Sequence, residues 1–359
     1  MAKFFGKQYT RNEILQKVGD VNQLASIRPV VLDDGPERGV RALFVSTACG
    51  LTLTILPDRG MDILDARFNG MPFGWQSAAG PAAPTFYDSF DDEWLRTFAG
   101  GVLTTCGLLN TGPASESEFE ALGMHGRISH TPARNVSFGG KWQNDDYFLW
   151  ATGDLIETKV MGYHLKLQRT YTFAADLPLI QIQDEIENLG FEPIAPMLLY
   201  HCNFGFPLLD EGTELLTVAE NVQPRDKAAA HGLDDFERMP APQPGIEEQV
   251  FFIEPDTGAT DQDQVGLVNR EFMQNQGFGV YIRYLQSSLP YLTVWKMPRP
   301  GTYVMGLEPG NCLPIGREAC EKKGMLQPLA PGDRRTFQLE IGVLADNNEI
   351  RAFEAELRG

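Results

Sequence analysis

The chain has 359 residues, of which 43% are hydrophobic and 22% are charged, which is the composition of a globular protein and not of a disordered one. Its net charge of −18 argues against a general nucleic-acid binder and against adhesion to anionic membranes, because both need a basic face. Abundant aromatic, glycine and proline residues are typical of a large core with many turns.

The N-terminal part combines a short helix with the first strands. Residues 10–13 read Thr-Arg-Asn-Glu, the pattern of a capping box, and apolar residues follow at helical spacing, although Gly19 weakens the pattern. We therefore predict a helical extension over about residues 1–28. From residue 40 the hydrophobic period changes to two, and residues 51–55 predict a strand.

Alternating strands dominate the rest of the chain. Residues 164–173 and 180–188 predict the two strands of a long hairpin. Residues 278–284 and 337–343 predict two further strands with the same period. Helical pattern is scarce between the two ends of the chain, and no short-period repeat is present. The pattern favours an all-β, sandwich-like architecture over βαβ units, propellers or solenoids.

Two other segments complete the outline. The acidic stretch 226–264, which contains proline and glycine, is predicted to be a long loop or insertion. Asp346, with Glu349 three residues later, predicts the start of a C-terminal helix that ends at Gly359. We expect one large β domain over residues 1–359, with packed sheets wide enough to hold a cleft.

The cysteines and the hydrophobic runs bear on location. Five cysteines are present, an odd number, and no Cys-x-x-Cys pair occurs, so neither a disulfide framework nor a structural zinc site is expected. The opening residues lack the apolar core of a signal peptide. No run approaches the roughly 18 apolar residues of a membrane span. These features favour the cytoplasm and no membrane partner.

One histidine lies in a glycine-rich segment. His125 stands in "GMHGR", where Gly123 and Gly126 let the backbone bend closely around a ligand. A surface turn with a polar residue would have the same pattern. The segment "FAGGVLTTCGLLNTG" just upstream is suited to line a polar cleft, but its glycine spacing does not match a dinucleotide-binding motif.

A second histidine, His201, stands inside the apolar stretch "LLYHCNFGFPLL", residues 198–209. A histidine in such a strand is most often a core residue bonded to a backbone carbonyl. Burying a polar group unpaired costs about 1–3 kcal/mol, so His201 needs a partner in the protein, in water or in a substrate. Its neighbour Cys202 is expected to point to the opposite face, which makes it a poor catalytic thiol with this histidine.

Glu308 is the third candidate, in "YVMGLEPGNC", residues 303–312. A glutamate at the end of an apolar strand either caps a turn or serves a site. Two histidines and a glutamate are a metal-ligand set, but no HxH or HExxH pair is present. No GxSxG elbow for nucleophilic hydrolysis occurs either. We therefore expect neither a metal nor another cofactor.

The ordered motifs "GMHGR", "LLYHCNFGFPLL" and "VMGLEPGNC" resemble those of the aldose 1-epimerase, or galactose mutarotase-like, superfamily. The resemblance is closest to an uncharacterised aldose-epimerase-like subfamily with runs similar to "LPDRGMDI" and "GGVLTTCGL", and it covers about residues 30–345. It implies a β-supersandwich of two large antiparallel sheets with a sugar-binding cleft, with short helices at the two ends. The longer signatures of galactose mutarotases around both histidines are absent. The aspartate that holds sugar hydroxyls in those enzymes has no assigned counterpart.

The resemblance also implies a chemistry and a set of site residues. Glu308 would be the general base, His201 the general acid, and His125 would orient the sugar while its ring opens and closes. Arg127 would stabilise developing negative charge or hold an anionic substituent. Further residues expected to bind substrate are Arg59, Lys296, Asn203 and Trp75, with Trp295 as an alternative to Trp75.

Several alternatives stay open at this point. A carbohydrate-binding protein would use the same cleft without catalysis, because fold alone does not determine function. Another sugar epimerase or a lyase would act at a carbon-bound hydrogen. The expected partner is a small carbohydrate, either neutral, phosphorylated or acidic, and the chain is either a monomer or a homo-oligomer.

Overall fold

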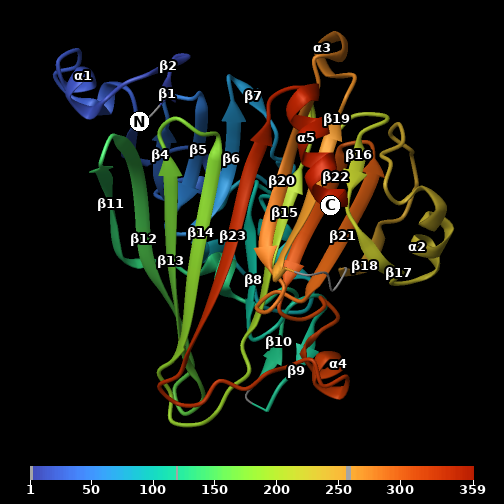
Figure 1. Cartoon of the computed structure of the whole chain (residues 1–359). Coiled ribbons are helices and arrows are strands. Elements are labelled where there is room, and N and C mark those ends of the chain that lie inside the picture. Colours follow the sequence, from blue (N-terminus) through green and yellow to red (C-terminus); the bar gives the residue numbers. More distant parts are fainter. Residues whose placement is uncertain (1–2, 119, 256–259) are drawn as a thin grey trace.

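The computed structural model describes residues 3–118, 120–255 and 260–359, and strands dominate it (Figure 1). Three antiparallel sheets of eight, six and five strands form the described part, together with two small two-stranded sheets. The all-β prediction is confirmed. The five-stranded sheet is an addition to the two large sheets that the sequence led us to expect.

The eight-stranded sheet has the order β11-β12-β13-β14-β23-β20-β19-β16. Its alternating strands bury one face, as the period of two predicts. The predicted long hairpin is confirmed by the pairing of β13 with β14. The strands are β11 Arg134–Gln143, β12 Asp146–Thr158, β13 His164–Ala174, β14 Leu179–Asn188, β23 Arg334–Leu344, β20 Phe278–Leu285, β19 Gln262–Asn269 and β16 Glu214–Leu216.

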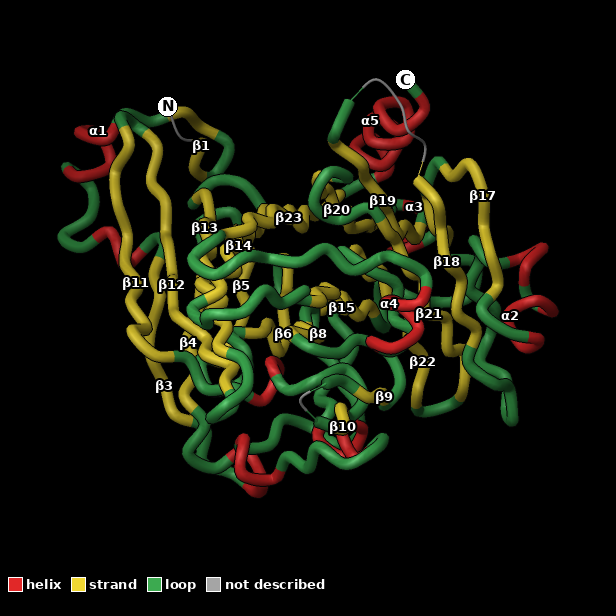
Figure 2. The backbone as a smooth tube through the Cα atoms, turned by 90° about the horizontal axis from the view of Figure 1, so that it is seen from below, coloured by secondary structure: helices red, strands yellow, loops and turns green. Residues whose placement is uncertain are grey.

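The six-stranded sheet has the order β17-β18-β21-β22-β15-β8. All eight residues of β15 are buried, so both faces of this strand are covered. Figure 2 shows the eight-stranded sheet, then β15 with β8, and then the loops around β9 and β10 as successive layers. The strands are β17 Ala219–Pro224, β18 Gln249–Pro255, β21 Tyr291–Arg299, β22 Thr302–Gly310, β15 Met197–Phe204 and β8 Thr104–Leu108.

The remaining strands lie in the five-stranded sheet, of order β3-β4-β5-β6-β7, and in the two small sheets. The strand predicted over residues 51–55 is confirmed as β5. The bounds are β3 Ser26–Val31, β4 Arg41–Ser46, β5 Leu51–Leu56, β6 Asp62–Phe68 and β7 Met71–Pro72, with β1 Lys3–Phe4 paired to β2 Lys7–Gln8 and β9 Ser115–Glu116 paired to β10 Ala121–Leu122.

The helices are short. Thr10 and Glu13 form the predicted capping box, but helix α1 ends after five residues, before the glycine that weakens the pattern, so the predicted extension is only partly helical. Asp346 caps the C-terminal helix as predicted. The α-helices are α1 Arg11–Leu15, α2 Lys227–His231, α3 Phe272–Asn275, α4 Arg317–Lys322 and α5 Asn347–Arg358, and short 3₁₀ helices cover Val21–Gln23, Gly35–Glu37, Pro84–Phe86, Glu93–Thr97, Ile128–His130 and Leu233–Asp235.

The prediction of a long loop over 226–264 is wrong for part of that stretch. It contains α2 and β18, and β19 begins at Gln262; residues 256–259 lie outside the described residues. The apolar run that forms β18 was outweighed by the surrounding acidic, proline and glycine residues. No helix in the described part of the chain is long and apolar enough to span a membrane.

Candidate active site

A row of four polar side chains crosses the six-stranded sheet. Thr293 of β21 pairs with Glu308 of β22, and His201 of β15 pairs with Thr104 of β8. The pairing of β15 with β22 places Cys202 opposite Leu307 and Leu199 opposite Gly310. In this antiparallel register His201 lies directly beside Glu308. Positions 107 residues apart in the sequence thus become neighbours on one sheet face.

The alternation of β15 separates this row from the core. Tyr200 and Cys202 belong to the main hydrophobic core, whereas Leu199 belongs to a smaller cluster on the other face. His201 lies on the same face as Leu199 and lines a cavity. The sequence-based prediction that Cys202 faces away from His201 agrees with this arrangement, and burial also raises the pKa of the Cys202 thiol, which keeps it protonated.

The side chains of His201 and Glu308 are in contact, but each has a buried polar atom that receives no hydrogen bond from the described residues. Nε2 of His201 lies 3.2 Å from Oε1 of Glu308. That contact is not a hydrogen bond: among the described residues, neither Oε1 of Glu308 nor Nδ1 of His201 has a hydrogen-bond partner. The hydroxyl of Thr293 is also buried and unpartnered within the described chain. Unpaired buried polar groups are rare and each needs an explanation, such as a catalytic role.

A glycine makes room for the carboxylate. A Cβ atom at Gly306 would lie 2.6 Å from Oε1 of Glu308 and 3.2 Å from Cβ of Trp295. Any larger residue at position 306 would therefore require the Glu308 carboxylate to move from its present position. The glycine in the "GLEPG" run therefore has a local steric reason.

His125 reaches the same cavity from a loop. Its backbone is in the left-handed region, with a φ of +56°, and its carbonyl accepts a hydrogen bond from the Gly107 amide. Nδ1 of His125 accepts a hydrogen bond of 3.3 Å from the Gly112 amide. A neutral imidazole that accepts at Nδ1 carries its proton on Nε2, so His125 is available as a donor at Nε2. The His125 and His201 rings lie 5.6 Å apart, edge to face.

The cavity around these residues has a volume of about 830 Å³. Aromatic rings form much of its wall: Phe98 and Trp295 each lie 5.4 Å from the His201 ring, and Trp94 lies 4.7 Å from the His125 ring. Trp75 lies 6.1 Å from Trp295. Both tryptophans that the sequence offered for the cleft therefore line it.

Burial controls the protonation of the three candidate catalytic groups. It lowers the pKa of His201 to about 3, with the nearby His125 lowering it further, and it lowers the pKa of His125 to about 4. Burial raises the pKa of Glu308 well above its ordinary value, and the Glu248 carboxylate adds to this rise. The protein environment thus favours neutral forms of all three groups.

A charged pair that the sequence analysis missed also lines the cavity. Glu248 accepts hydrogen bonds from Nε1 of Trp295 at 3.0 Å and from the Arg225 guanidinium at 2.8 Å. Arg225 is also paired with Asp226 at 2.8 Å. Glu248 is the last residue before β18, and the apolar run that begins at Val250 is the sequence signal that could have placed it next to a strand.

Comparisons with known proteins give the family of the chain. Residues 37–343 match the model of a family described as Domain of unknown function (DUF4432). The chain belongs to the DUF4432 family. No protein of curated function matches it.

Three solved structures similar to this DUF4432 chain have names that refer to an aldose 1-epimerase, a galactose mutarotase or a galactose 1-epimerase. A Klebsiella pneumoniae protein provisionally assigned as an aldose 1-epimerase is 26% identical, with a TM-score of 0.88 over 96% of this chain and 89% of that one. A galactose mutarotase-like protein from Clostridium acetobutylicum is 13% identical, with a TM-score of 0.63 over 90% and 100% of the two chains. A galactose 1-epimerase from Lactobacillus acidophilus is 12% identical, with a TM-score of 0.57 over 90% and 100%. The last two show the shared fold alone.

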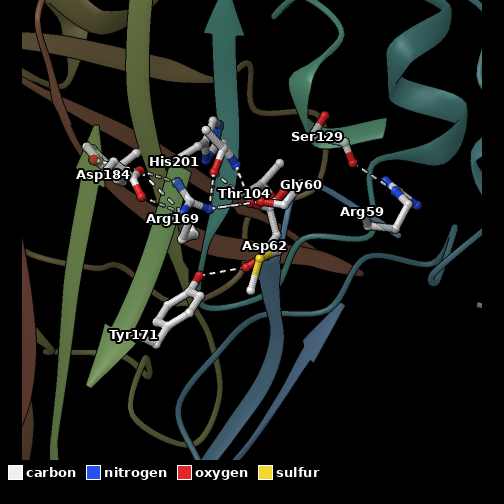
Figure 3. Close-up of polar contacts among 12 residues, drawn as sticks. Arg59, Gly60, Asp62, Thr104, Ser129, Arg169, Tyr171, Asp184 and His201 are labelled. Atoms are coloured by element: carbon white, nitrogen blue, oxygen red, sulfur yellow. Dashed lines mark hydrogen bonds and ion pairs between the residues drawn. The ribbon is translucent and has the colours of Figure 1, made fainter. Parts of the chain in front are cut away.

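Behind the candidate site, the DUF4432 chain buries an ionic cluster around Arg169 of β13 (Figure 3). Arg169 donates to both oxygens of Asp184, and also to Asp62 at 3.1 Å and to the Thr105 hydroxyl at 2.7 Å. The hydroxyl of Tyr200 donates to Asp184 at 2.9 Å. Tyr200 precedes His201 in β15, so this cluster is anchored to the back of the strand that carries the histidine.

Arg59, expected to bind substrate, lies outside the cavity lining. Its buried guanidinium donates to the Ser129 carbonyl, as Figure 3 shows. It also donates to the carbonyls of Ala82 and Thr97 and contacts Nε2 of His130 at 2.9 Å. These bonds hold the segment that carries Trp94, whose Nε1 donates to the Ser129 hydroxyl. Arg59 thus supports a cavity wall and is not among the described residues that line the cavity.

Three more residues expected to bind substrate also lie elsewhere. Arg127 lies beside Glu120 at a separate surface hollow, with an N–O distance of 3.4 Å. Lys296 is buried and donates to the Asp235 carbonyl at 2.7 Å, and burial lowers its pKa to about 8. Asn203 is fully buried and donates to the Gly101 and His201 carbonyls. A sequence pattern cannot show which long side chains find protein partners, so these three are not carried into the proposed site.

Metal ligands do not gather anywhere in the described residues, where no group of three His, Cys, Asp or Glu side chains is placed to hold an ion. All five cysteines of the chain are free.

Proposed function

We propose that this protein interconverts the anomers of a free sugar by general acid–base catalysis, as an aldose 1-epimerase does. One observation carries the proposal: His201 and Glu308 lie 3.2 Å apart in a cavity, with buried polar atoms that no described residue satisfies. A substrate with adjacent oxygens would provide the missing hydrogen bonds. Such unsatisfied, strongly perturbed groups in a cavity are typical of a functional site.

In the proposed reaction, the proton of the neutral Glu308 carboxyl first passes to Nε2 of His201, 3.2 Å away, and the resulting Glu308 carboxylate takes the proton from the anomeric hydroxyl. The bond between C1 and the ring oxygen breaks, and protonated His201 gives its proton to the ring oxygen. The product is the open aldehyde, with Glu308 protonated and His201 neutral. Rotation about the C1–C2 bond and reversal of both proton transfers then give the other anomer.

The protonation preferences of the pair suit this exchange. A carboxylate whose pKa is raised is a stronger base, and an imidazolium whose pKa is lowered is a stronger acid. After ring opening both groups are neutral, which is the state that burial favours. The protein environment therefore stabilises the open-chain stage, from which either anomer forms.

Other cavity residues would bind and orient the sugar. His125 would donate from Nε2 to a sugar oxygen near the anomeric centre, because its Nδ1 is already engaged with Gly112. Glu248 would accept from sugar hydroxyls, since a carboxylate has about four acceptor positions and two donors occupy part of them. The faces of Trp75 and Trp295 would cover the apolar C–H faces of the ring.

The test is anomer exchange measured by NMR on a panel of free sugars. Glu308→Gln should lower the exchange rate by about 10²–10⁴-fold, because the amide cannot act as the base. Glu157→Gln is a matched control, since Glu157 is a buried glutamate outside this cavity. Equal rates for wild type and Glu308→Gln on every sugar that binds would refute the assignment.

The same experiment separates the alternatives. Sugar binding without anomer exchange would identify a carbohydrate-binding protein. Deuterium uptake from heavy water into a carbon-bound position would identify an epimerase or a lyase that acts at carbon, because anomer exchange moves no such hydrogen. A cytoplasmic location remains a prediction, and the five free thiols are compatible with a reducing compartment.

A further inference from the structure

The cavity offers no free positive charge for an anionic sugar. Among its described lining residues, Arg225 is the one arginine or lysine. Its guanidinium is already bonded to Asp226 and to Glu248, each at 2.8 Å. Arg59 and Lys296, which would have served a phosphate or a uronate, donate to backbone carbonyls outside the cavity.

The negatively charged groups of the cavity also disfavour an anionic sugar. The Glu248 carboxylate and Glu308 lie in one lining, and Glu248 raises the pKa of Glu308 by repulsion. A phosphate or carboxylate on the substrate would add a second negative charge near these groups in a poorly solvated space, where such repulsion is strong. The charges therefore favour an uncharged ligand.

The cavity is also larger than one sugar ring. A hexose has about a dozen non-hydrogen atoms, and at the roughly 30 Å³ that a water molecule occupies in the liquid they fill at most about 360 Å³. The cavity volume of about 830 Å³ is more than twice that value. Room for a second group of similar size remains once one ring occupies the catalytic row.

The lining of the extra space suits a second sugar ring. The 3₁₀ helix Glu93–Thr97 supplies the half-exposed Leu95, while Met124 and Ile315 also line the cavity. These apolar surfaces fit the C–H faces of a ring, and the hydroxyl-bearing Thr302 is in the same lining. An all-apolar substituent would leave that hydroxyl facing hydrocarbon.

We propose that the substrate is an uncharged reducing disaccharide, whose reducing ring lies on His201 and Glu308 and whose second ring lies against Leu95. This inference rests on the proposed function, because only a reducing ring has the free anomeric hydroxyl. Binding energy from the second ring positions the first one, so it raises the rate as well as the affinity.

The test compares anomer exchange of glucose, glucose 6-phosphate, glucuronate, maltose, cellobiose and lactose with the full chain. At least one disaccharide should have a kcat/KM about tenfold or more above that of glucose, and the two anionic sugars should lie below glucose. Glucose exchanged as efficiently as every disaccharide, or an anionic sugar preferred, would overturn the proposal.

A matched pair of leucine variants locates the second ring. Leu95 and Leu177 are both 51% exposed, but only Leu95 lines the cavity. Leu95→Ala should raise the KM for the preferred disaccharide by roughly three- to tenfold, a larger change than in the KM for glucose. Leu177→Ala should leave both sugars unchanged. Equal effects of Leu95→Ala on glucose and on the disaccharide would contradict the assigned position of the second ring.

The experiments distinguish failure of the proposed catalysis from failure of the proposed substrate. If no sugar in the panel exchanges faster than in buffer, the proposed catalysis is wrong. Ligand-observed NMR binding then decides the inference on its own, because a disaccharide should still displace glucose from the cavity and the anionic sugars should bind more weakly than glucose.

Discussion

The two faces of β15 carry buried polar clusters that the fold treats in opposite ways. On one face, Tyr200 joins the Arg169 cluster, where Arg169 donates to two carboxylates and a hydroxyl. On the other face, His201 and Glu308 each leave a buried polar atom without a hydrogen bond from the described residues. Adjacent residues of one strand therefore belong to a satisfied cluster and to an unsatisfied one.

This difference distinguishes polar side chains that stabilise the fold from polar side chains that are available to bind a ligand. A buried ion cluster is tolerable only when each charge is paired and hydrogen-bonded, as the Arg169 cluster is. Unpaired buried groups reduce stability, and proteins retain them chiefly at functional sites. The satisfied face holds β15 in place, and the unsatisfied face presents His201 to the cavity.

Removing the central charge of the satisfied cluster should have the largest effect. Arg169→Met leaves Asp184 and Asp62 buried without the cation that donates hydrogen bonds to both, and should lower the free energy of unfolding by about 3–5 kcal/mol, measured by urea denaturation. Arg334→Met is the control, because Arg334 is largely exposed and its pairs with Glu185 and Glu187 are worth at most about 1 kcal/mol. Similar stabilities for the two variants would contradict the stabilising role that is assigned to the Arg169 cluster.

The pH dependence of the free energy of unfolding should reveal the lowered pKa of His201, which lies on the unsatisfied face of β15. The pKa of His201 falls to about 3 on folding from an ordinary value of about 6.5, so between these values the unfolded chain binds a proton that the folded chain does not. Stability should therefore be lost as the pH falls below about 6.5, by about 2 kcal/mol from this group between pH 7 and pH 5.

Comparison with His201→Gln isolates this contribution. Urea denaturation of the variant should show a loss between pH 7 and pH 5 that is smaller than that of wild type by the same amount. Parallel profiles of the two proteins over this range would show that His201 is not held neutral by burial.

A matched pair of threonines should give the smallest effect. Thr105→Val removes a hydroxyl that donates to Asp62 and accepts from Arg169, and should cost about 1–3 kcal/mol of stability. Thr293→Val removes a hydroxyl with no partner among the described residues and should leave stability unchanged or slightly raised. Thermal or urea unfolding of both variants tests the pair; an equal loss in Thr293→Val would show that its hydroxyl is satisfied in solution.

Much of this architecture follows from local pattern. The period-two strands, the capping box at Thr10 and the cap at Asp346 depend on residues near each other in the chain, so the sequence predicted them. The apolar run of β18 was missed because it is short and its acidic, glycine- and proline-containing surroundings are typical of loops.

The candidate site likewise combines features that the sequence predicted with features that only the folded chain shows. The sequence by itself determined that His201 stands in a strand needing a partner, and that His125 and Glu308 stand in motifs of the same family. Only the tertiary structure decided that Glu308 lies beside His201, because strand register sets which distant residues meet. It also decided that Arg59 and Lys296 bond to backbone carbonyls outside the cavity, since a long side chain binds whatever acceptor the folded chain brings within its reach.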